Sequence, residues 1–259
     1  MGFRKLLVTA VGVVTALTAV AVPASSSVQI VGGTRASTTT YSYAVYLTNP
    51  DGFQFCGGTL VTPDKVITAA HCAKGQKPEN VRVVAGRDDK EATNTGMSVA
   101  VEGIWVHPKF TDALIGYDVA VLTLAKRIGY RSIPLAGDQD TALYAPNGMA
   151  TILGWGRTES GGPTSQYLLK ADVPVVSDTS CRQSFDKYNA SAMVCAGYPQ
   201  GGMDGCQGDS GGPLVFKGKL IGVSSWGEGC GLPNKPGVYT RVTSYTQELT
   251  QQTSDYPTP

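Results

Sequence analysis

Residues 204–226 read DGCQGDSGGPLVFKGKLIGVSSW, a glycine-rich loop around Ser210 that leads into a long apolar run. Shorter runs of the same kind recur from Tyr43 onward, and clusters of Gly, Pro, Asn and Asp separate them. Runs of this length and composition are typical of antiparallel strands. We interpret as strands YAVYL, KVITAA, VRVVAG, SVAVEGIWV, DVAVLTL, ATILGW, KADVPVV, PLVFKGKLIGVSSW and GVYTRV. The sequence therefore predicts an all-β fold, either barrels or a sandwich.

The predicted strands fall into two groups. Residues 132–148, SIPLAGDQDTALYAPNG, separate the groups and have the composition of a linker. The chain of 259 residues is long enough for one large all-β domain or two smaller ones. We place a first β unit at residues 30–139 and a second at residues 140–241. A cleft between two such units is a common ligand site.

The two ends of the chain depart from the strand pattern. Arg4 and Lys5 precede an apolar run that closes with small residues, so residues 1–24 read as a secretory signal. An uncleaved membrane anchor is the alternative, since the run is nearly long enough to span a bilayer, but no stop-transfer charges follow it. Residues 242–259 read as a short helix and a loose tail, because apolar side chains repeat there at three- and four-residue steps: Val242, Tyr245 and Leu249.

The charge balance excludes several classes of partner. The 21 basic and 20 acidic residues leave a net charge of +1, which provides no electrostatic footprint for nucleic acid or for an anionic membrane. Beyond the signal, no run of residues is apolar for long enough to span a bilayer. We therefore expect a secreted, extracellular protein with no nucleic-acid partner and no membrane association.

The six cysteines predict disulfides, because an exported chain meets an oxidising compartment. Six cysteines allow 15 connectivities, and parity does not choose among them. Sequential neighbours give the simplest set, which pairs Cys56 with Cys72, Cys181 with Cys195, and Cys206 with Cys230. A metal site is the alternative, but the chain has no CxxC or HExxH motif and only two histidines. We therefore expect no metal and no cofactor.

Three residues are candidates for nucleophilic catalysis. A serine such as Ser210 becomes a useful nucleophile when a base takes its proton and a third group fixes the tautomer of that base. His71 follows an apolar strand in VITAAHCAK, and the second histidine, His107, lies in IWVHPKF. Asp118 begins an apolar strand, where a histidine N–H would offset the cost of burying its charge. Taken singly, each histidine is more often structural, and an isolated aspartate such as Asp118 is more often a turn residue that opens a strand.

The motifs TAAHC, YDVAVL and GDSGGP, in this order along the chain, resemble those of the chymotrypsin-like serine endopeptidases, and of trypsin in particular. The resemblance extends through IVGG, FCGGTLV, GWG, SSWGEGCG and KPGVYTRV, and so covers nearly all of residues 30–250. It implies two six-stranded antiparallel β-barrels with the active site between them. It also implies that Ser210 attacks the scissile carbonyl, His71 transfers the proton and Asp118 orients the imidazolium, whereas His107 is structural.

The same resemblance implies the remaining parts of a trypsin-like site. Gly208 and Ser210 would offer backbone N–H groups to the oxyanion, and glycine permits the backbone geometry that this loop needs. Asp204 would lie at the base of the primary specificity pocket and favour substrates with Arg or Lys at the cleaved bond. The pocket walls would be kept small by Gly227, Gly229 and Gly237.

Gly205 departs from the family pattern, in which most trypsins have a serine after the pocket acid. The hydroxyl of that serine can hydrogen-bond a lysine ammonium. A guanidinium, by contrast, can pair bidentately with Asp204 without the hydroxyl. We therefore expect cleavage after Arg to be preferred over cleavage after Lys.

Activation is a second departure from the pattern. Family members are usually zymogens, and cleavage before Ile30 would release residues 25–29 as a short propeptide and create an ammonium that pairs with Asp209. Gln29, not Arg or Lys, precedes this bond, so we expect another protease to cut it. The expected partners are protein and peptide substrates with Arg or Lys, an activating protease and protein protease inhibitors. The protein itself is expected to be a monomer.

Other functions compete with this interpretation. A non-catalytic binding relative would have lost its nucleophile or its base, but both are present here. An esterase of small molecules would keep the same residues, and comparing peptide with ester turnover separates the two. Residues 85–94, AGRDDKEATN, correspond to the calcium loop of animal trypsins and contain oxygen ligands. Arg87 and Lys90 argue against calcium, so we expect a solvated charged loop.

Overall fold

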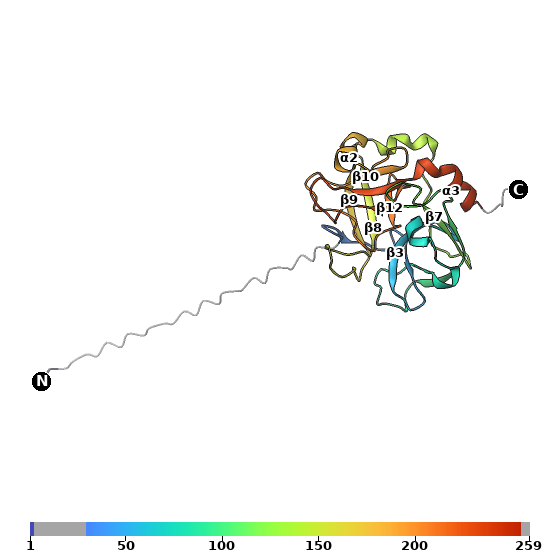
Figure 1. The fold of residues 1–259 in the computed structure, drawn as a ribbon. Helices are drawn as coiled ribbons and strands as arrows, with labels where there is room; N and C mark the ends of the chain where they lie inside the picture. The colour runs from blue at the N-terminus through green and yellow to red at the C-terminus, as the bar shows by residue number, and fades with distance from the viewer. Residues whose placement is uncertain (3–29, 255–259) are drawn as a thin grey trace.

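The computed structural model describes residues 1–2 and 30–254, so the predicted signal and propeptide lie outside the described residues, apart from Met1 and Gly2. Two closed six-stranded barrels, antiparallel throughout, make up most of the described chain. Figure 1 shows the barrels stacked, with the first coloured blue to green and the second yellow to red. The predicted fold class is confirmed. The predicted boundary between residues 139 and 140 stays a prediction, and a short 3-10 helix, η2 (Asp138–Tyr144), runs across it.

The first barrel closes because the strand at one end of its sheet pairs with the strand at the other end. Its strands follow the order β2 (Ala44–Thr48), β3 (Gln54–Thr62), β4 (Lys65–Thr68), β7 (Ala120–Leu124), β6 (Met97–Val106) and β5 (Arg82–Ala85). Every residue of β2 is buried, since one face of this strand lines the barrel and the other is covered. Closure leaves this barrel without an exposed sheet edge.

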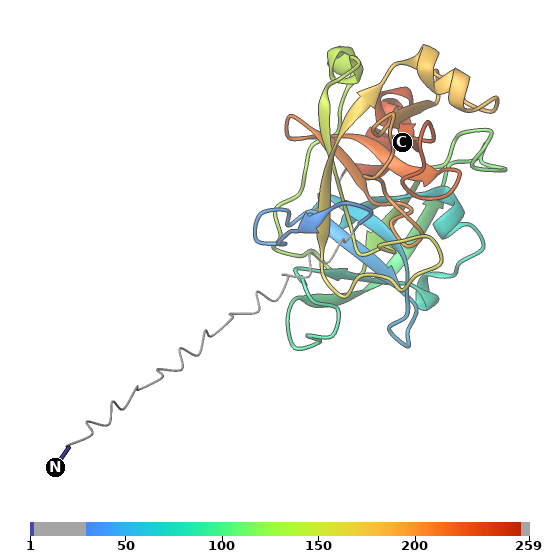
Figure 2. The ribbon, with the colours of Figure 1, turned by 90° about the vertical axis from the view of Figure 1, so that its left-hand side faces the viewer.

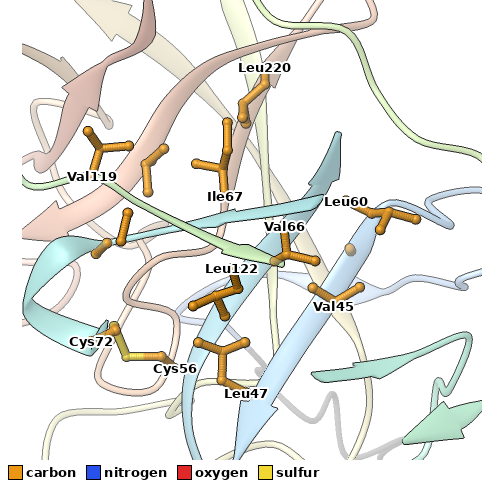
Figure 3. Packing of buried hydrophobic residues seen from close by; sticks show 14 of the residues in the cluster. Val45, Leu47, Cys56, Leu60, Val66, Ile67, Cys72, Val119, Leu122 and Leu220 are labelled. Carbon is orange, nitrogen blue, oxygen red and sulfur yellow. A yellow bond between two sulfur atoms is a disulfide. The ribbon is translucent and has the colours of Figure 1, made fainter. Parts of the chain in front are cut away.

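The core of the first barrel is made of aliphatic side chains that point inward from successive strands. Figure 3 shows Val45, Leu47, Leu60, Val66 and Leu122 converging in this core, and each is at most 1% exposed. Burying one such side chain stabilises the fold by about 1.5–3 kcal/mol. The same cluster continues to Leu220 in the second barrel, so the two barrels pack through a shared apolar contact.

The second barrel is built in the same way from β8 to β13. Its strands follow the order β8 (Met149–Gly154), β9 (Leu169–Val176), β10 (Met193–Ala196), β13 (Gly237–Arg241), β12 (Lys219–Trp226) and β11 (Pro213–Phe216), which pairs back with β8. A seventh strand, β1 (Thr34–Arg35), pairs with Leu169 and Lys170 at the start of β9, so the start of the folded chain lies on the second barrel (Figure 2).

Helices are few and short in the described part of the chain. They are α1 (Ala70–Ala73), α2 (Asp178–Ser184) and α3 (Thr246–Thr253), with the 3-10 helices η1 (Pro78–Asn80) and η3 (Val242–Tyr245) besides η2. The predicted C-terminal helix is confirmed as η3 and α3, and its three repeating apolar side chains are all buried. Across residues 30–254, no helix has the length and apolar character that a bilayer crossing requires.

Three disulfides join the six cysteines. Their pairs are Cys56–Cys72, Cys181–Cys195 and Cys206–Cys230, the local pairs expected from the sequence. The first lies in the first barrel, where it ties β3 to α1, and the other two lie in the second barrel. No disulfide therefore crosses from one barrel to the other.

The loop after β5 is only in part the solvated charged loop that we expected. Arg87 is only 9% exposed, and its guanidinium donates to the carbonyls of Thr95 (2.8 Å) and Thr93 (3.0 Å). Asp88 accepts hydrogen bonds from the backbone and the hydroxyl of Thr38. The expectation was wrong for Arg87, because the loop folds around the guanidinium, which satisfies carbonyls that would otherwise need water or a cation. Glu91, Thr93 and Asn94 are exposed, as expected.

Candidate active site

Asp118 lies at the seam between the barrels, two residues before β7, and is 1% exposed. Its Oδ1 accepts the backbone N–H of His71 at 2.8 Å, and its Oδ2 accepts the hydroxyl of Ser225 at 2.6 Å. His71 Nδ1 lies 2.8 Å from the same Oδ2. Such donors offset the cost of burying a carboxylate, which is the reason this charge can lie at a buried strand start.

The backbone around Asp118 is held by the second barrel and by the C-terminal helix. Thr240, in β13, donates its hydroxyl to the Asp118 carbonyl at 2.8 Å. Tyr117 has a φ of 58°, a left-handed conformation that is unusual for a residue with a side chain. Its N–H donates to the Tyr245 hydroxyl at 2.9 Å, so η3 helps to hold the turn that aims the carboxylate.

His71 is part of α1, next to Cys72 and its disulfide, and its side chain is 31% exposed. The Asp118 carboxylate can only accept, so it favours the tautomer with the proton on Nδ1. That tautomer leaves Nε2 as an acceptor, which is the state a general base needs. The second histidine, His107, is buried between Trp105, Tyr117 and Tyr245. Burial lowers the pKa of His107, as expected of a structural histidine.

Ser210 belongs to the second barrel, and its backbone rests on the first. Its carbonyl accepts the N–H of Gly57, in β3, at 2.7 Å and lies 3.7 Å from Cys72 Sγ, next to His71. Gly211 follows with a φ of 81°, and a Cβ at this position would collide with the Thr68 hydroxyl. Within residues 30–254 no hydrogen bond joins the Ser210 hydroxyl to the His71 ring. Their proximity is shown by the contact between the Ser210 carbonyl and Cys72, the residue after His71.

Asp209 holds the loop that carries Ser210. Its buried carboxylate accepts the N–H groups of Gly156 (2.7 Å) and Cys206 (3.0 Å). Burial raises its pKa to about 6, although these two N–H groups act in the opposite direction. In the described chain, the N–H groups of Gly208 and Ser210 donate to no protein acceptor, so both can bind an external oxygen.

Ile30 lies beside Asp209. Its side chain is 1% exposed, and both residues line the same small cavity of about 10 Å³. The next residue, Val31, accepts the N–H of Asp204 at 3.3 Å. The structure therefore brings the predicted activation residues together with the predicted pocket acid.

A second cavity, of about 220 Å³, is lined by both Ser210 and Asp204. Asp204 is 6% exposed, and its Oδ2 accepts the N–H of Gly231 at 3.0 Å. Burial raises the pKa of Asp204 to about 7; the N–H groups of Gly231 and Gly205 lower it, and the charge of Asp209 raises it. A larger cavity of about 460 Å³ lies beside α2, but none of the predicted site residues lines it.

The four predicted pocket glycines all line the 220 Å³ cavity: Gly205, Gly227, Gly229 and Gly237. A Cβ on Gly237 would lie 2.8 Å from the Asp204 carboxylate, so a side chain there would obstruct the acid. A Cβ on Gly227 would come no nearer than 4.0 Å to other protein atoms, which shows that the space beside it is open. A Cβ on Gly205 would make ordinary contacts at 3.9 Å, so this position has room for a small side chain.

The site also contains residues that the sequence did not reveal. Ser225 and Thr240 contact Asp118, and Gln54 contacts the carbonyl of Gly208 in the loop of Ser210. Lys90 reaches this loop through Gln54. Ser225 is buried in β12, and nothing in the sequence distinguishes it from its neighbour Ser224. The one cluster of possible metal ligands in the part that the structure describes is Cys56, His71 and Cys72, and its cysteines are in a disulfide.

Two antiparallel barrels that bring a serine, a histidine and a buried aspartate to their seam have the architecture of chymotrypsin-like serine endopeptidases. A search with family profiles matches residues 30–248 to the family described as Trypsin. The chain is 52% identical over 223 residues to "Trypsin" of Saccharopolyspora erythraea, covering 86% of this chain and 97% of that one.

Two insect proteins are also similar. Identity is 40% over 221 residues to the "Vitellin-degrading protease" of Bombyx mori, covering 84% of this chain and 83% of that protein. Identity is 36% over 244 residues to "Trypsin eta" of Drosophila melanogaster, covering 91% and 93%. The chain therefore belongs to the trypsin family and is a serine endopeptidase that acts on protein substrates.

Proposed function

We propose that this protein is a secreted endopeptidase that cleaves after Arg, and less efficiently after Lys, and that it is made as a zymogen. The observation that supports this specificity most directly is the Asp204 carboxylate, which is 6% exposed and lines the same 220 Å³ cavity as Ser210. In residues 30–254 no basic side chain forms an ion pair with Asp204. A buried acid without a cationic partner favours a ligand that supplies one.

The proposed mechanism is acyl transfer through Ser210. The Ser210 Oγ attacks the scissile carbonyl carbon while His71 Nε2 takes its proton, and Asp118 stabilises the imidazolium that forms. The carbonyl oxygen becomes an oxyanion, which the N–H groups of Gly208 and Ser210 stabilise. The intermediate then expels the amine, which receives the proton from His71. Water repeats the sequence on the acyl-enzyme and releases the carboxylic acid.

Gly205 is the reason for proposing that Arg is preferred. A guanidinium can form two parallel hydrogen bonds with the Asp204 carboxylate. The lysine side chain is shorter than that of arginine, and its ammonium needs a further acceptor nearby. Gly205 has no hydroxyl to offer, although it lines the cavity. The preference is therefore expected to depend on this one position.

Activation is proposed to follow cleavage before Ile30, with secretion directed by residues 1–24. The new ammonium would pair with Asp209, and this is supported by the cavity that both residues line. Because Gln29 precedes the bond, another protease is proposed to make the cut. N-terminal sequencing of protein secreted by a protease-deficient host tests this step, because appearance of Ile30 there would show that the enzyme activates itself. Protein protease inhibitors and a monomeric state are further expectations.

The specificity is tested with peptides that differ only in Arg, Lys or Phe at the cleaved bond, using protein that begins at Ile30. We expect kcat/KM to be highest for Arg, lower for Lys and negligible for Phe. Gly205→Ser should raise kcat/KM for Lys relative to Arg, whereas the matched control Gly205→Ala adds the same Cβ without the hydroxyl and should not. Turnover of Phe would show that the assignment of Asp204 to the pocket is wrong. Equal values for Arg and Lys would show that the argument from Gly205 is wrong.

A further inference from the structure

A polar chain of three groups lies behind the loop that carries Gly208. Lys90, in the loop after β5, donates its ammonium to Gln54 Oε1 at 2.8 Å and to the Thr164 hydroxyl at 2.9 Å. Gln54, the first residue of β3, is 8% exposed and donates its Nε2 to the Gly208 carbonyl at 3.2 Å. These hydrogen bonds thus link a charged loop of the first barrel to Gly208, the proposed oxyanion-binding residue of the second.

The ammonium determines which way the Gln54 amide points. An ammonium can only donate, so the amide oxygen must face Lys90 and the amide nitrogen must face the opposite group. That group is the Gly208 carbonyl, which can only accept. A half-turn of the amide would place its nitrogen against the ammonium and its oxygen against the carbonyl, so both groups favour the same orientation, and loss of the ammonium removes one of the two.

The orientation matters because strand β3 holds both residues of the proposed oxyanion site by their carbonyls. The side chain of Gln54 binds the Gly208 carbonyl, and the N–H of Gly57 binds the Ser210 carbonyl. Gly208 has a φ of 99° and no side chain of its own to restrain it. In the described chain its carbonyl has no other hydrogen-bond donor than Gln54. Loss of this bond therefore frees the residue whose N–H must be aimed at the oxyanion.

The charge on Lys90 also acts on Asp209, whose carboxylate holds the loop that carries Ser210. Lys90 is half-buried, and burial lowers its pKa to about 8, while the negative charge of Asp209 acts in the opposite direction. The same attraction lowers the pKa of Asp209, against the larger effect of burial. Lys90 therefore favours the ionised Asp209 that accepts the loop N–H groups.

We propose that Lys90, acting through Gln54, is a positioning residue for the oxyanion-binding N–H groups of Gly208 and Ser210. The proposal rests on the peptidase mechanism proposed above, in which these two groups stabilise the tetrahedral intermediate. Removing an oxyanion donor outright lowers kcat by about 10²–10³-fold, and misaiming one costs part of that. We therefore expect loss of Lys90 to lower kcat by about 10- to 100-fold and to leave KM within about threefold.

The test compares Lys90→Met and Gln54→Glu with the unaltered enzyme on an Arg peptide. Gln54→Glu keeps an acceptor for the Lys90 ammonium, but its carboxylate cannot donate to the Gly208 carbonyl, so it should lower kcat as Lys90→Met does. Lys90→Arg keeps a donor-only cation and should retain most of kcat. Lys126→Met changes an exposed lysine in the turn after β7 and serves as the matched control.

Two inhibitors separate positioning from a general loss of structure. A peptide argininal forms a hemiacetal with Ser210 whose oxygen occupies the oxyanion site, whereas benzamidine binds the Asp204 pocket alone. Both loss variants should bind the argininal more weakly by the factor lost in kcat and should bind benzamidine within about twofold of the unaltered enzyme. Unchanged kcat, or parallel loss of both inhibitors, would overturn the proposal. An unaltered enzyme that fails to cleave the Arg peptide would instead overturn the proposed function.

Discussion

Lowering the pH from 8 to 5 is predicted to weaken the binding of benzamidine, a monocation, to the Asp204 pocket. Burial raises the pKa of this carboxyl to about 7 in the empty pocket. A raised pKa means that the carboxyl becomes neutral as the pH falls through 7, and a neutral acid does not pair with a cation. The affinity should therefore be greatest above pH 7 and should fall about tenfold for each pH unit below it.

The size of the effect follows from the fraction of Asp204 that is ionised. With a pKa of about 7, that fraction is about 0.9 at pH 8 and about 0.01 at pH 5, so Kd should rise about 90-fold. With the ordinary aspartate pKa of 3.8, Kd would change by only about 6% over the same range. Binding at pH 6 should also release about 0.9 proton, because the bound cation forces the carboxyl to ionise.

Isothermal titration calorimetry in two buffers of different ionisation enthalpy measures both Kd and the released proton. The protein should carry His71→Ala, so that the imidazole does not titrate beside the pocket, and should begin at Ile30, so that Asp209 has its proposed ammonium partner. Asp204→Asn is the control and should bind weakly at every pH. A Kd that stays constant from pH 8 to pH 5 would refute the inference that burial raises the pKa of Asp204 to about 7.

Two further changes test the site and the fold. Asp118→Asn should lower kcat about 10⁴-fold, the loss typical of this triad in related enzymes, because an amide no longer holds the His71 proton on Nδ1; benzamidine affinity should stay unchanged, and a loss in kcat below tenfold would contradict the role. Arg87→Met should lower the free energy of unfolding by about 1–2 kcal/mol in urea, because two loop carbonyls lose their donor, and a calcium chelator should leave the unaltered protein's unfolding midpoint where it was.

The strand pattern predicted most of the fold, and its omissions have a physical cause. Strand β3 (Gln54–Thr62) was not among the runs interpreted as strands, because Gly57 and Gly58 interrupt its apolar pattern. A Cβ on Gly57 would lie 3.1 Å from the backbone of Gly212, so the strand gives up a side chain where the nucleophile loop presses against it. Strand β10 (Met193–Ala196) is only four residues long, which is too short for a pattern to stand out.

The candidate site was predictable where it is written in local motifs and not where it depends on distant contacts. Ser210, His71 and Asp118 each lie in a recognisable segment. Gln54 and Gly208, by contrast, are 154 residues apart and meet only because β3 passes behind the nucleophile loop. The burial of Arg87 was not predictable for the same reason, since its partners are backbone carbonyls, and Asp88 accepts from Thr38, 50 residues away in the chain.

The absence of a disulfide between the barrels has a consequence for how this enzyme would be inactivated. The bonds that cross the seam include Gly57 to Ser210, Ser225 to Asp118 and Thr240 to the Asp118 carbonyl. These hydrogen bonds also hold the catalytic residues in place. A small separation of the two barrels would therefore disrupt the active site, while each barrel keeps its own hydrogen bonds and disulfides. Loss of activity should therefore report such a separation more sensitively than any spectroscopic signal of secondary structure. A tight inhibitor that contacts both barrels should oppose the separation.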